Sequence, residues 1–266
     1  MKEVHKKVLF PVMKKGLPDK MKRKNFLTEF LSLIFRFFLP QECPLCGKMP
    51  SDGTGNMFCK ECLEKFHFVK NPVCPGCGGE LTGILELCTD CLHAPGKRKW
   101  KKASALFVME GTVKEVVYKY KYRKCTFLAA PLGNMAAEKL AAGSFHPDII
   151  SYTPLHWTRY LLRGYNQAEL LAMEIGRNTH IPVARLLKRT KFTRQQARLK
   201  RGERIRNMHK AFKAVDPEKI RGKRILLIDD VLTTGATLSS ATEELLKAGA
   251  AEVNIFVLAV RHSDSR

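Results

Sequence analysis

The sequence contains no apolar run long enough to cross a bilayer and no cleavage site typical of a signal peptide. Its longest apolar stretch, from Phe26 to Leu39, is interrupted by Glu29 and Arg36, and it is shorter than the roughly 20 residues that a membrane-spanning helix needs. The residues that follow, from Pro40 onward, show no small-x-small pattern. We therefore expect a cytoplasmic protein without a transmembrane segment.

Two common phosphate-binding loops are also absent, and acidic residues are scarce. The chain has neither Gly-x-x-x-x-Gly-Lys-Ser/Thr nor Gly-x-Gly-x-x-Gly after a strand, which excludes the nucleotide-binding classes that depend on these loops. The 25 acidic residues are outnumbered by 47 basic ones, giving a formal net charge of +22. Residues 185–224 alone hold 16 basic and three acidic residues. A field of this sign favours polyanions such as nucleotides, nucleic acid or an anionic membrane surface.

Cysteines, by contrast, are numerous and regularly spaced. Eight of the nine form four Cys-x-x-Cys pairs, and a Cys-Pro-x-Cys-Gly knuckle followed by a Cys-x-x-Cys-Leu knuckle occurs twice. In a chain without a secretion signal such pairs indicate metal rather than disulfides. Zinc prefers four thiolates in a closed tetrahedron that leaves no position for water, so we predict two structural zinc sites. Sequential grouping of the ligands is the simplest arrangement, and a crossed grouping is the alternative. The predicted ligands are Cys43, Cys46, Cys59 and Cys62 in site one, and Cys74, Cys77, Cys88 and Cys91 in site two.

The rest of the chain alternates between strand and helix patterns. We predict strands at 104–110, 148–153, 183–187, 224–228 and 252–260, and helices at 112–122, 126–141, 168–178 and 236–248. This alternation predicts an α/β domain with a mostly parallel sheet flanked by helices over residues 100–266. A cysteine-rich zinc-ribbon module at 40–96 precedes it. Residues 1–24 are predicted to be a basic, weakly ordered lead-in.

The stretch 25–39 is predicted to be an apolar helix. Because its apolar residues surround it almost completely, a helix here must be buried. It docks either on the rest of this chain, or on a partner protein or membrane interface.

The most specific motif runs from Ile225 to Thr237. An apolar strand leads into Asp229 and Asp230, and the chain then turns through Thr-Thr-Gly-Ala-Thr into a helix. Backbone N–H groups of such a turn, together with the positive end of the helix, can hold a phosphate. Carboxylates at the end of the strand can accept hydrogen bonds from the two hydroxyls of a ribose. The predicted phosphate-binding residues are Thr233, Thr234, Gly235, Ala236 and Thr237.

This motif resembles the phosphoribosyl-pyrophosphate (PRPP) motif of the type I phosphoribosyltransferases over 13 contiguous positions. The resemblance implies a site in which Mg²⁺ bridges the diphosphate and the ribose hydroxyls, with Asp229 and Asp230 at the catalytic centre. It also implies a diphosphate-binding loop after the strand at 148–153, which makes Arg163 and Gly164 candidates for diphosphate contact. The alternative for Arg163 is a surface arginine near a helix start.

The same resemblance implies a mobile flap over the basic stretch 189–207. A lid that closes over diphosphate needs cations and polar donors, and the flap candidates are Thr193, Gln196, Arg204 and Asn207. A solvated basic loop is one alternative. Contact with a single-stranded nucleic-acid backbone is the other, although this stretch offers only Phe192 and Phe212 for stacking.

Together these motifs resemble the ComF family over about residues 26–262. The resemblance rests on the short apolar stretch, the zinc knuckles, Arg-Gly-Tyr-Asn-Gln at 163–167, the Thr-x-x-Gln and Arg-x-x-Asn spacings, and the PRPP motif. It implies a role in DNA uptake and natural transformation, with GntX-type proteins as relatives. It also implies PRPP, single-stranded DNA, a ComFA-type helicase and other transformation proteins as partners, with peripheral association at the inner face of the membrane as an option.

Three functions are compatible with these observations. The first is an enzyme that transfers phosphoribose to an unidentified acceptor. The second is an adaptor for DNA uptake that binds single-stranded DNA and uses the PRPP site as a sensor, and we rank it first. The third is a nucleobase-salvage transferase unrelated to DNA.

Overall fold

The computed structural model describes residues 42–49, 57–81, 84–93, 98–143, 145–190 and 211–261. The predicted lead-in, the apolar helix and the four flap candidates Thr193, Gln196, Arg204 and Asn207 lie outside these residues. Within the described ranges, no helix combines the length and apolarity needed to cross a bilayer.

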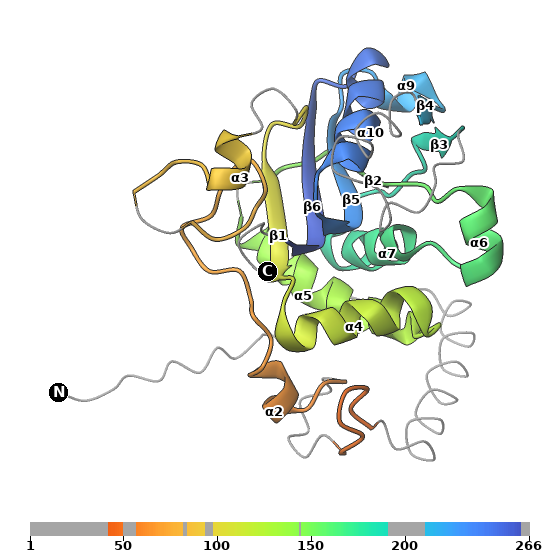
Figure 1. Ribbon diagram of the computed structural model, residues 1–266. Helices are drawn as coiled ribbons and strands as arrows, with labels where there is room; N and C mark the ends of the chain where they lie inside the picture. Colours follow the sequence, from red (N-terminus) through yellow and green to blue (C-terminus); the bar gives the residue numbers. More distant parts are fainter. Residues whose placement is uncertain are drawn as a thin grey trace, which may run out of the picture.

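A four-stranded sheet forms the centre of the carboxyl-terminal domain (Figure 1). Its strands are β1 (Ala103–Val108), β2 (Ile149–Tyr152), β5 (Arg224–Leu232) and β6 (Glu252–Val260), in the spatial order β1-β6-β5-β2. All three neighbouring pairs are parallel. The predicted α/β class with a parallel sheet is therefore confirmed.

Helices cover both faces of this sheet. On one face lie α4 (Gly111–Tyr122), α5 (Ala129–Ala141) and α7 (Gln167–Thr179), and on the other lies α10 (Ala236–Lys247). Side chains of β5 alternate between two cores, because successive strand residues point to opposite faces. Leu226 and Ile228 pack in one core, whereas Ile225 and Leu227 pack in the core that contains α10. Burial on both faces explains why the strand is a continuous apolar run.

Several local predictions need correction. The strand predicted at 224–228 continues to Leu232, because its backbone keeps pairing with β6 up to Val260. Of the strand predicted at 183–187, Val183 forms only an isolated bridge to Ile150. The chain instead forms β3 (Leu187–Arg189), which pairs antiparallel with β4 (Phe212–Ala214). The helices α6 (Trp157–Arg163) and α9 (Pro217–Ile220) were not predicted, because each is too short to show a helical period.

The cysteine module packs directly on the sheet domain. It contains two short helices, α2 (Lys60–Leu63) and α3 (Thr89–Leu92). Phe66 places its ring 5.3 Å from that of Phe107 in β1, at an edge-on angle of 85°. Gly78 lies so close to the backbone of Ser104 and Ala105 that a Cβ would come within 2.6 Å of it. The module thus completes its small core with residues of the larger domain.

Candidate functional site

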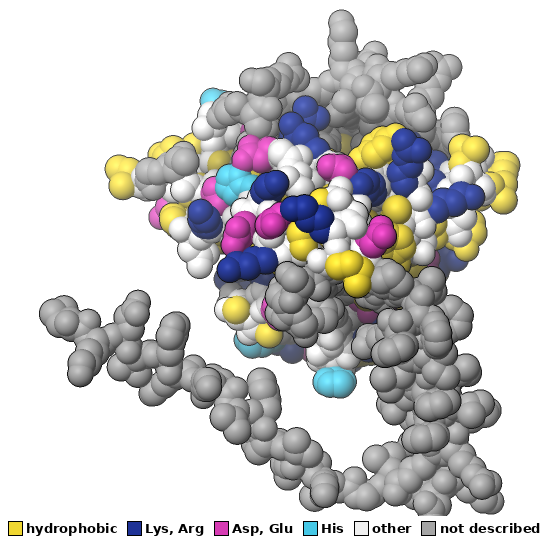
Figure 2. All heavy atoms as spheres, turned by 90° about the horizontal axis from the view of Figure 1, so that it is seen from below, with side chains coloured by type: hydrophobic (Ala, Val, Ile, Leu, Met, Phe, Trp, Pro, Cys, Tyr) yellow, Lys and Arg dark blue, Asp and Glu magenta, His cyan; other side chains and the backbone are white. Residues whose placement is uncertain are grey.

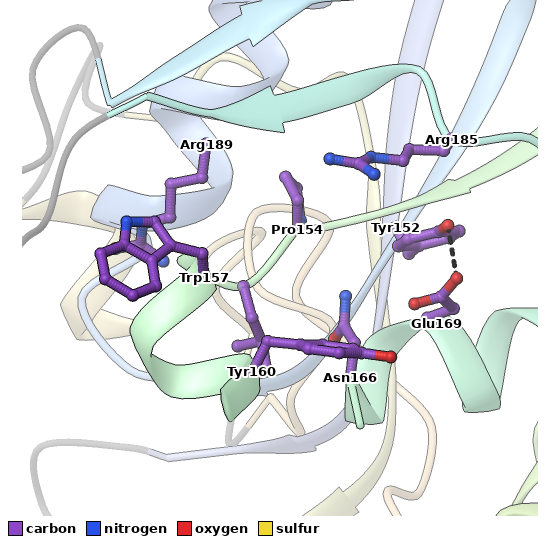
Figure 3. A pocket seen from close by; sticks show the side chains of 9 residues that line it. Tyr152, Pro154, Trp157, Tyr160, Asn166, Glu169, Arg185 and Arg189 are labelled. Atoms are coloured by element: carbon purple, nitrogen blue, oxygen red, sulfur yellow. Dashed lines mark hydrogen bonds between the residues drawn. The ribbon is translucent and has the colours of Figure 1, made fainter. Parts of the chain in front are cut away.

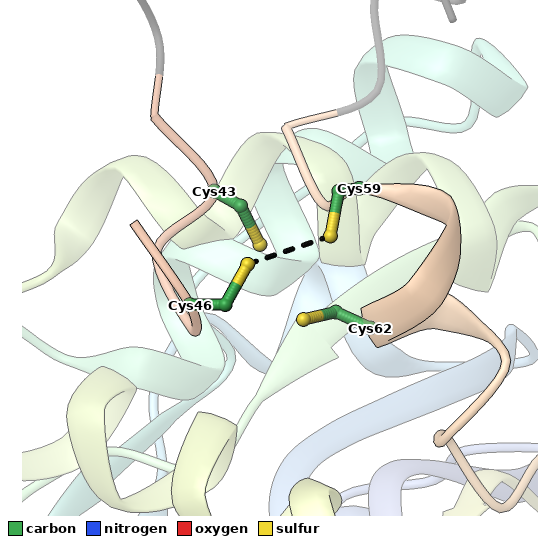
Figure 4. A group of neighbouring side chains, drawn as sticks. All are labelled: Cys43, Cys46, Cys59 and Cys62. Carbon is green, nitrogen blue, oxygen red and sulfur yellow. Dashed lines mark hydrogen bonds between the residues drawn. The ribbon is translucent and has the colours of Figure 1, made fainter. Parts of the chain in front are cut away.

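The eight paired cysteines form two compact groups. In each group the four sulfur atoms lie within 4.8 Å of one another. One group lies within residues 43–62 (Figure 4), and the other lies within residues 74–91. The structure therefore selects the sequential grouping over the crossed one. Cys46 and Cys59 have their sulfurs 3.5 Å apart, and Cys74 and Cys91 have theirs 3.3 Å apart. These separations approach the roughly 3.8 Å between thiolates that share one tetrahedral zinc ion. Cys125 belongs to neither group.

Crowding of the thiols in site two is consistent with a bound cation. Hydrogen bonding from Cys77 lowers the pKa of Cys74 to about 6, while hydrogen bonding to Cys74 raises the pKa values of Cys77 and Cys91 above the ordinary 9.0. Four such thiols cannot all ionise at neutral pH unless a cation compensates their charge. The guanidinium of Arg98 already donates to Cys91 Sγ. Each group offers four cysteine ligands, as a zinc-ribbon site does.

The two aspartates of the phosphate motif lie within β5, near its end. Both residues are partly exposed, although protein atoms enclose the carboxyl group of Asp229. Because they are adjacent strand residues, they have different partners. The Thr153 hydroxyl donates to Asp229 Oδ1 at 2.8 Å, and the backbone N–H of Asp230 donates to the same oxygen at 2.9 Å. Asp230 instead forms an ion pair with Lys121 of α4, whose Nζ lies 3.0 Å from its Oδ1.

The environment of Asp229 strongly favours its protonated form. Desolvation, followed by the negative charge of Asp230, raises the pKa of Asp229 from 3.8 to about 7. Between these two pH values the folded protein holds a proton that the unfolded chain has released. This contribution to stability is therefore lost as the pH rises towards 7. A cation or hydrogen-bond donor bound to the ionised carboxylate would favour the charged form and offset this loss of stability.

The turn after β5 leads into α10 through a glycine. Gly235 has φ +74°, in the left-handed region that favours glycine, and forms the amino-terminal cap of α10. Ser239 N donates to Gly235 O at 2.8 Å as the helix begins, and Ala236 N donates to the hydroxyl of Thr234 at 3.4 Å. The N–H groups of a first helical turn have no partner within the helix and carry its positive end. This turn can therefore hold an anion.

Three cations lie near the aspartates, and of these only Arg189 falls in the predicted flap, as the first residue of the stretch 189–207. Lys121 contacts Asp230 directly. Burial and then the charge of Arg163 lower the pKa of Arg159, and Asp230 opposes this effect. Burial and then the charge of Arg159 lower the pKa of Arg189 to about 10, and Asp229 opposes that. Each arginine thus lies within electrostatic range of one carboxylate. This arrangement of positive groups around two carboxylates suits a polyanion that brings its own divalent cation.

Arg163 and Gly164 occupy the end of α6. The Arg163 guanidinium donates to Gln167 Oε1 at 3.1 Å and lies 4.8 Å from the ring centre of Tyr122. Gly164 has φ +81° and caps α6, donating its N–H to Tyr160 O at 2.7 Å. The predicted diphosphate contacts thus already have partners within the protein. Arg159 lies one helical turn before Arg163, and the charge of Asp230 acts on its pKa. Its spacing from Arg163 was the only local signal for it.

A hollow of about 290 Å³ opens beyond the carboxyl end of β2 (Figure 3). Thr153, which donates to Asp229, directly follows its lining residue Tyr152. Aromatic side chains line part of it, and Tyr152 donates its hydroxyl to Glu169 Oε1 at 2.8 Å. Arg185 and Arg189 line another side. At the mouth, Trp157 is 66% exposed and Tyr160 50% exposed. Figure 2 shows apolar and basic side chains gathered together at the edge of the molecule where α6 lies in Figure 1.

Two family models match separate parts of the chain. The double zinc ribbon domain matches residues 34–92, and the phosphoribosyl transferase domain matches residues 164–266. The first contains both cysteine groups. The second contains the aspartates and the turn that follows them.

Curated relatives match most of the chain. The "Competence protein F" of Haemophilus influenzae is 29% identical over 224 residues, covering 77% of this chain and 97% of the relative. The "DNA utilization protein YhgH" of Escherichia coli is 28% identical over 226 residues, covering 83% of this chain and 97% of the relative. The "Competence protein ComFC" of Bacillus subtilis is 27% identical over 208 residues, covering 75% and 82%. Each relative therefore aligns across both the cysteine module and the sheet domain.

Proposed function

The chain is a member of the ComF family, with a double zinc ribbon and a phosphoribosyltransferase domain, and on that premise we propose that it binds PRPP with Mg²⁺ and acts in the uptake or utilisation of DNA. One observation carries the PRPP proposal. Two carboxylates near the end of β5 are followed directly by a glycine-capped helix start, and cations surround both. The role in DNA rests on the names of the relatives. The ComFA-type helicase partner and the cytoplasmic location stay predictions.

Each part of PRPP has a matching group in this proposal. The 5′-phosphate is held by the turn from Thr233 to Thr237, where the helix start attracts an anion. The ribose hydroxyls donate to Asp229 and Asp230. The diphosphate lies towards Arg159 and Arg189, whose guanidinium groups suit bidentate contact with phosphate oxygens.

Mg²⁺ fits the same set of residues. It is usually bound through one or two carboxylates together with substrate phosphates, and both aspartates offer oxygen ligands. Bound Mg²⁺ supplies charge compensation between these carboxylates and the diphosphate. Without ligand, Asp230 has Lys121 as its ion-pair partner, with Lys121 Nζ 3.0 Å from Asp230 Oδ1.

Calorimetric titration with PRPP tests the proposal. In the presence of Mg²⁺ we expect one PRPP per chain to bind, and we expect weaker binding when Mg²⁺ is omitted, because the carboxylates and the diphosphate then repel each other. Ribose 5-phosphate is the matched ligand without diphosphate, and it should bind more weakly than PRPP. Absence of any PRPP binding with Mg²⁺ would exclude the proposed site.

We further propose that single-stranded DNA binds along α6 and the adjacent hollow. Proteins of this kind combine stacking aromatics with a basic track for the backbone. Trp157 and Tyr160 are exposed aromatics on α6, and Arg185 and Arg189 line the hollow beside them. These aromatics supply the stacking surface that the basic stretch itself lacks.

Fluorescence anisotropy with a labelled oligothymidylate tests this second proposal. Trp157→Ala should cost about 1–3 kcal/mol, or roughly 5- to 150-fold in affinity, because one stacked base is lost. Arg185→Ala should reduce the slope of log affinity against log salt by about 0.7, because one phosphate contact is lost. Lys65→Ala, at an exposed position of the cysteine module, is the control and should change neither. Binding that is unaffected by both Trp157→Ala and Arg185→Ala would place the DNA elsewhere.

A further inference from the structure

Trp100 lies between the second zinc site and the phosphate-binding turn. It is buried, with 6% of its surface exposed, and it belongs to the core that also contains Leu232 and Leu238 on either side of the turn. The same core contains Cys74, Cys77 and Cys91. One side chain therefore contacts two segments that the sequence separates by more than a hundred residues.

The indole is held from the zinc side. Its Nε1 donates to the backbone oxygen of Gly76 at 2.9 Å, and Gly76 lies between the ligands Cys74 and Cys77. The guanidinium of Arg98, which donates to Cys91 Sγ, lies 5.9 Å from the ring centre of Trp100. The position of the indole thus depends on the shape of a knuckle that zinc closes.

The opposite edge of the indole supports the turn. A Cβ added to Gly235 would come within 2.9 Å of Trp100 Cη2 and 3.7 Å of Cζ3. Gly235 begins α10, so its backbone conformation sets the direction of the N–H groups that follow it. Sites that bind through fixed donors lose affinity when the supporting shell allows shifts of about 0.5–1 Å.

We propose that Trp100 is a positioning residue for the phosphate-binding turn, and that zinc in the Cys74, Cys77, Cys88 and Cys91 site sets the affinity for PRPP through it. This inference rests on the proposed binding of PRPP. Zinc closes the knuckle, the knuckle orients the indole, and the indole keeps the turn in its binding conformation. Loss of zinc from site two therefore weakens PRPP binding even though no zinc ligand lies in the PRPP site.

Site one offers a matched control within the same protein. Three of its four cysteines pack in the other core, with Phe58, Phe66 and Phe107. Its knuckle contacts α4, where Lys119 Nζ donates to Pro44 O at 2.7 Å. Loss of zinc from site one should therefore leave the turn in place.

The test uses the full chain, with PRPP affinity measured by calorimetry and zinc content measured with a colorimetric indicator. Cys88→Ser should remove one zinc per chain and weaken PRPP binding about tenfold. Cys46→Ser should also remove one zinc but change PRPP affinity less than twofold.

Trp100→Phe keeps every zinc ligand and separates the inference from simple unfolding of the ribbon. It loses the hydrogen bond to Gly76 and the outer ring edge, so calorimetry should show PRPP affinity about tenfold weaker with two zinc ions still bound. Combining it with Cys88→Ser should add little further loss, since both changes act through the same contact. Unchanged affinity in Trp100→Phe, fully additive losses, or an equal loss in Cys46→Ser would overturn the inference. Failure of the wild-type chain to bind PRPP with Mg²⁺ would instead overturn the proposed function.

Discussion

Asp229→Asn is expected to weaken the binding of PRPP with Mg²⁺ by roughly 10- to 150-fold. The substitution replaces a charged acceptor by a neutral amide of the same shape, and a hydrogen bond to a charged group contributes about 1.5–3 kcal/mol. The fold should survive, because the site of Asp229 already favours a neutral side chain. Calorimetry measures the affinity, and thermal unfolding at pH 8 should show no loss of stability.

The same residue should make PRPP binding depend on pH. The pKa of Asp229 is about 7 in the folded protein, and the ionised form is the better acceptor for ribose hydroxyls and ligand for Mg²⁺. The affinity should therefore fall as the pH drops below about 7, by up to tenfold per pH unit for one linked proton. Asp229→Asn should remove this dependence. A variant that kept both the affinity and the pH profile of the wild-type chain would contradict the assigned role of Asp229.

Asp148→Asn is the matched carboxylate control. Asp148 lies before β2, at the opposite end of the strand from the site, and the hydrogen bond from Arg224 lowers its pKa to about 2. Its ionised form supports a surface ion pair, with Arg224 Nη2 2.7 Å from Asp148 Oδ1. The substitution should leave PRPP affinity unchanged, so a loss there would indicate a general effect of removing a carboxylate.

Removal of both zinc ions is expected to unfold the cysteine module. Each structural zinc site of this type contributes on the order of 10 kcal/mol to the free energy of folding. The reason is that the unfolded chain has no preformed site, so the free energy of zinc binding stabilises the folded module. Denatured protein should release two zinc ions per chain, measured with a colorimetric indicator. After chelation, amide hydrogens between residues 57 and 93 should exchange much faster, whereas those of β5 and β6 should stay protected longer.

Cys125→Ser serves as the control for this experiment. Cys125 is outside both cysteine groups and is partly exposed, so the variant should keep two zinc ions and the exchange pattern of the wild-type chain. Disulfides in place of zinc would contradict the assignment. They would appear as missing thiols when the denatured protein is titrated with a thiol reagent.

Local chemistry made two features of this protein predictable. A Cys-x-x-Cys turn brings two thiolates together whatever surrounds it, and the repeat of such turns indicated two sites. The PRPP motif is likewise contiguous, so its strand, turn and helix start follow from neighbouring residues, as Gly235 with its left-handed backbone illustrates. The strand of this motif was predicted from its apolar run at 225–228 for the same reason.

Contacts between distant segments could be found only in the tertiary structure. Strand β5 continues beyond the aspartates to Leu232 because its backbone hydrogen-bonds to β6 up to that residue. This pairing depends on the neighbouring strand, so the side chains of β5 do not reveal it. Lys121 meets Asp230 from a helix more than a hundred residues earlier, and Trp100 meets Gly235 from before β1. Nothing in the residues flanking Lys121 or Trp100 marks them as part of a site. The sequence alone therefore determined which chemical groups the protein carries in its local motifs. Only the tertiary structure decided which cations and which indole lie next to those groups, because these neighbours depend on how the helices and strands pack together.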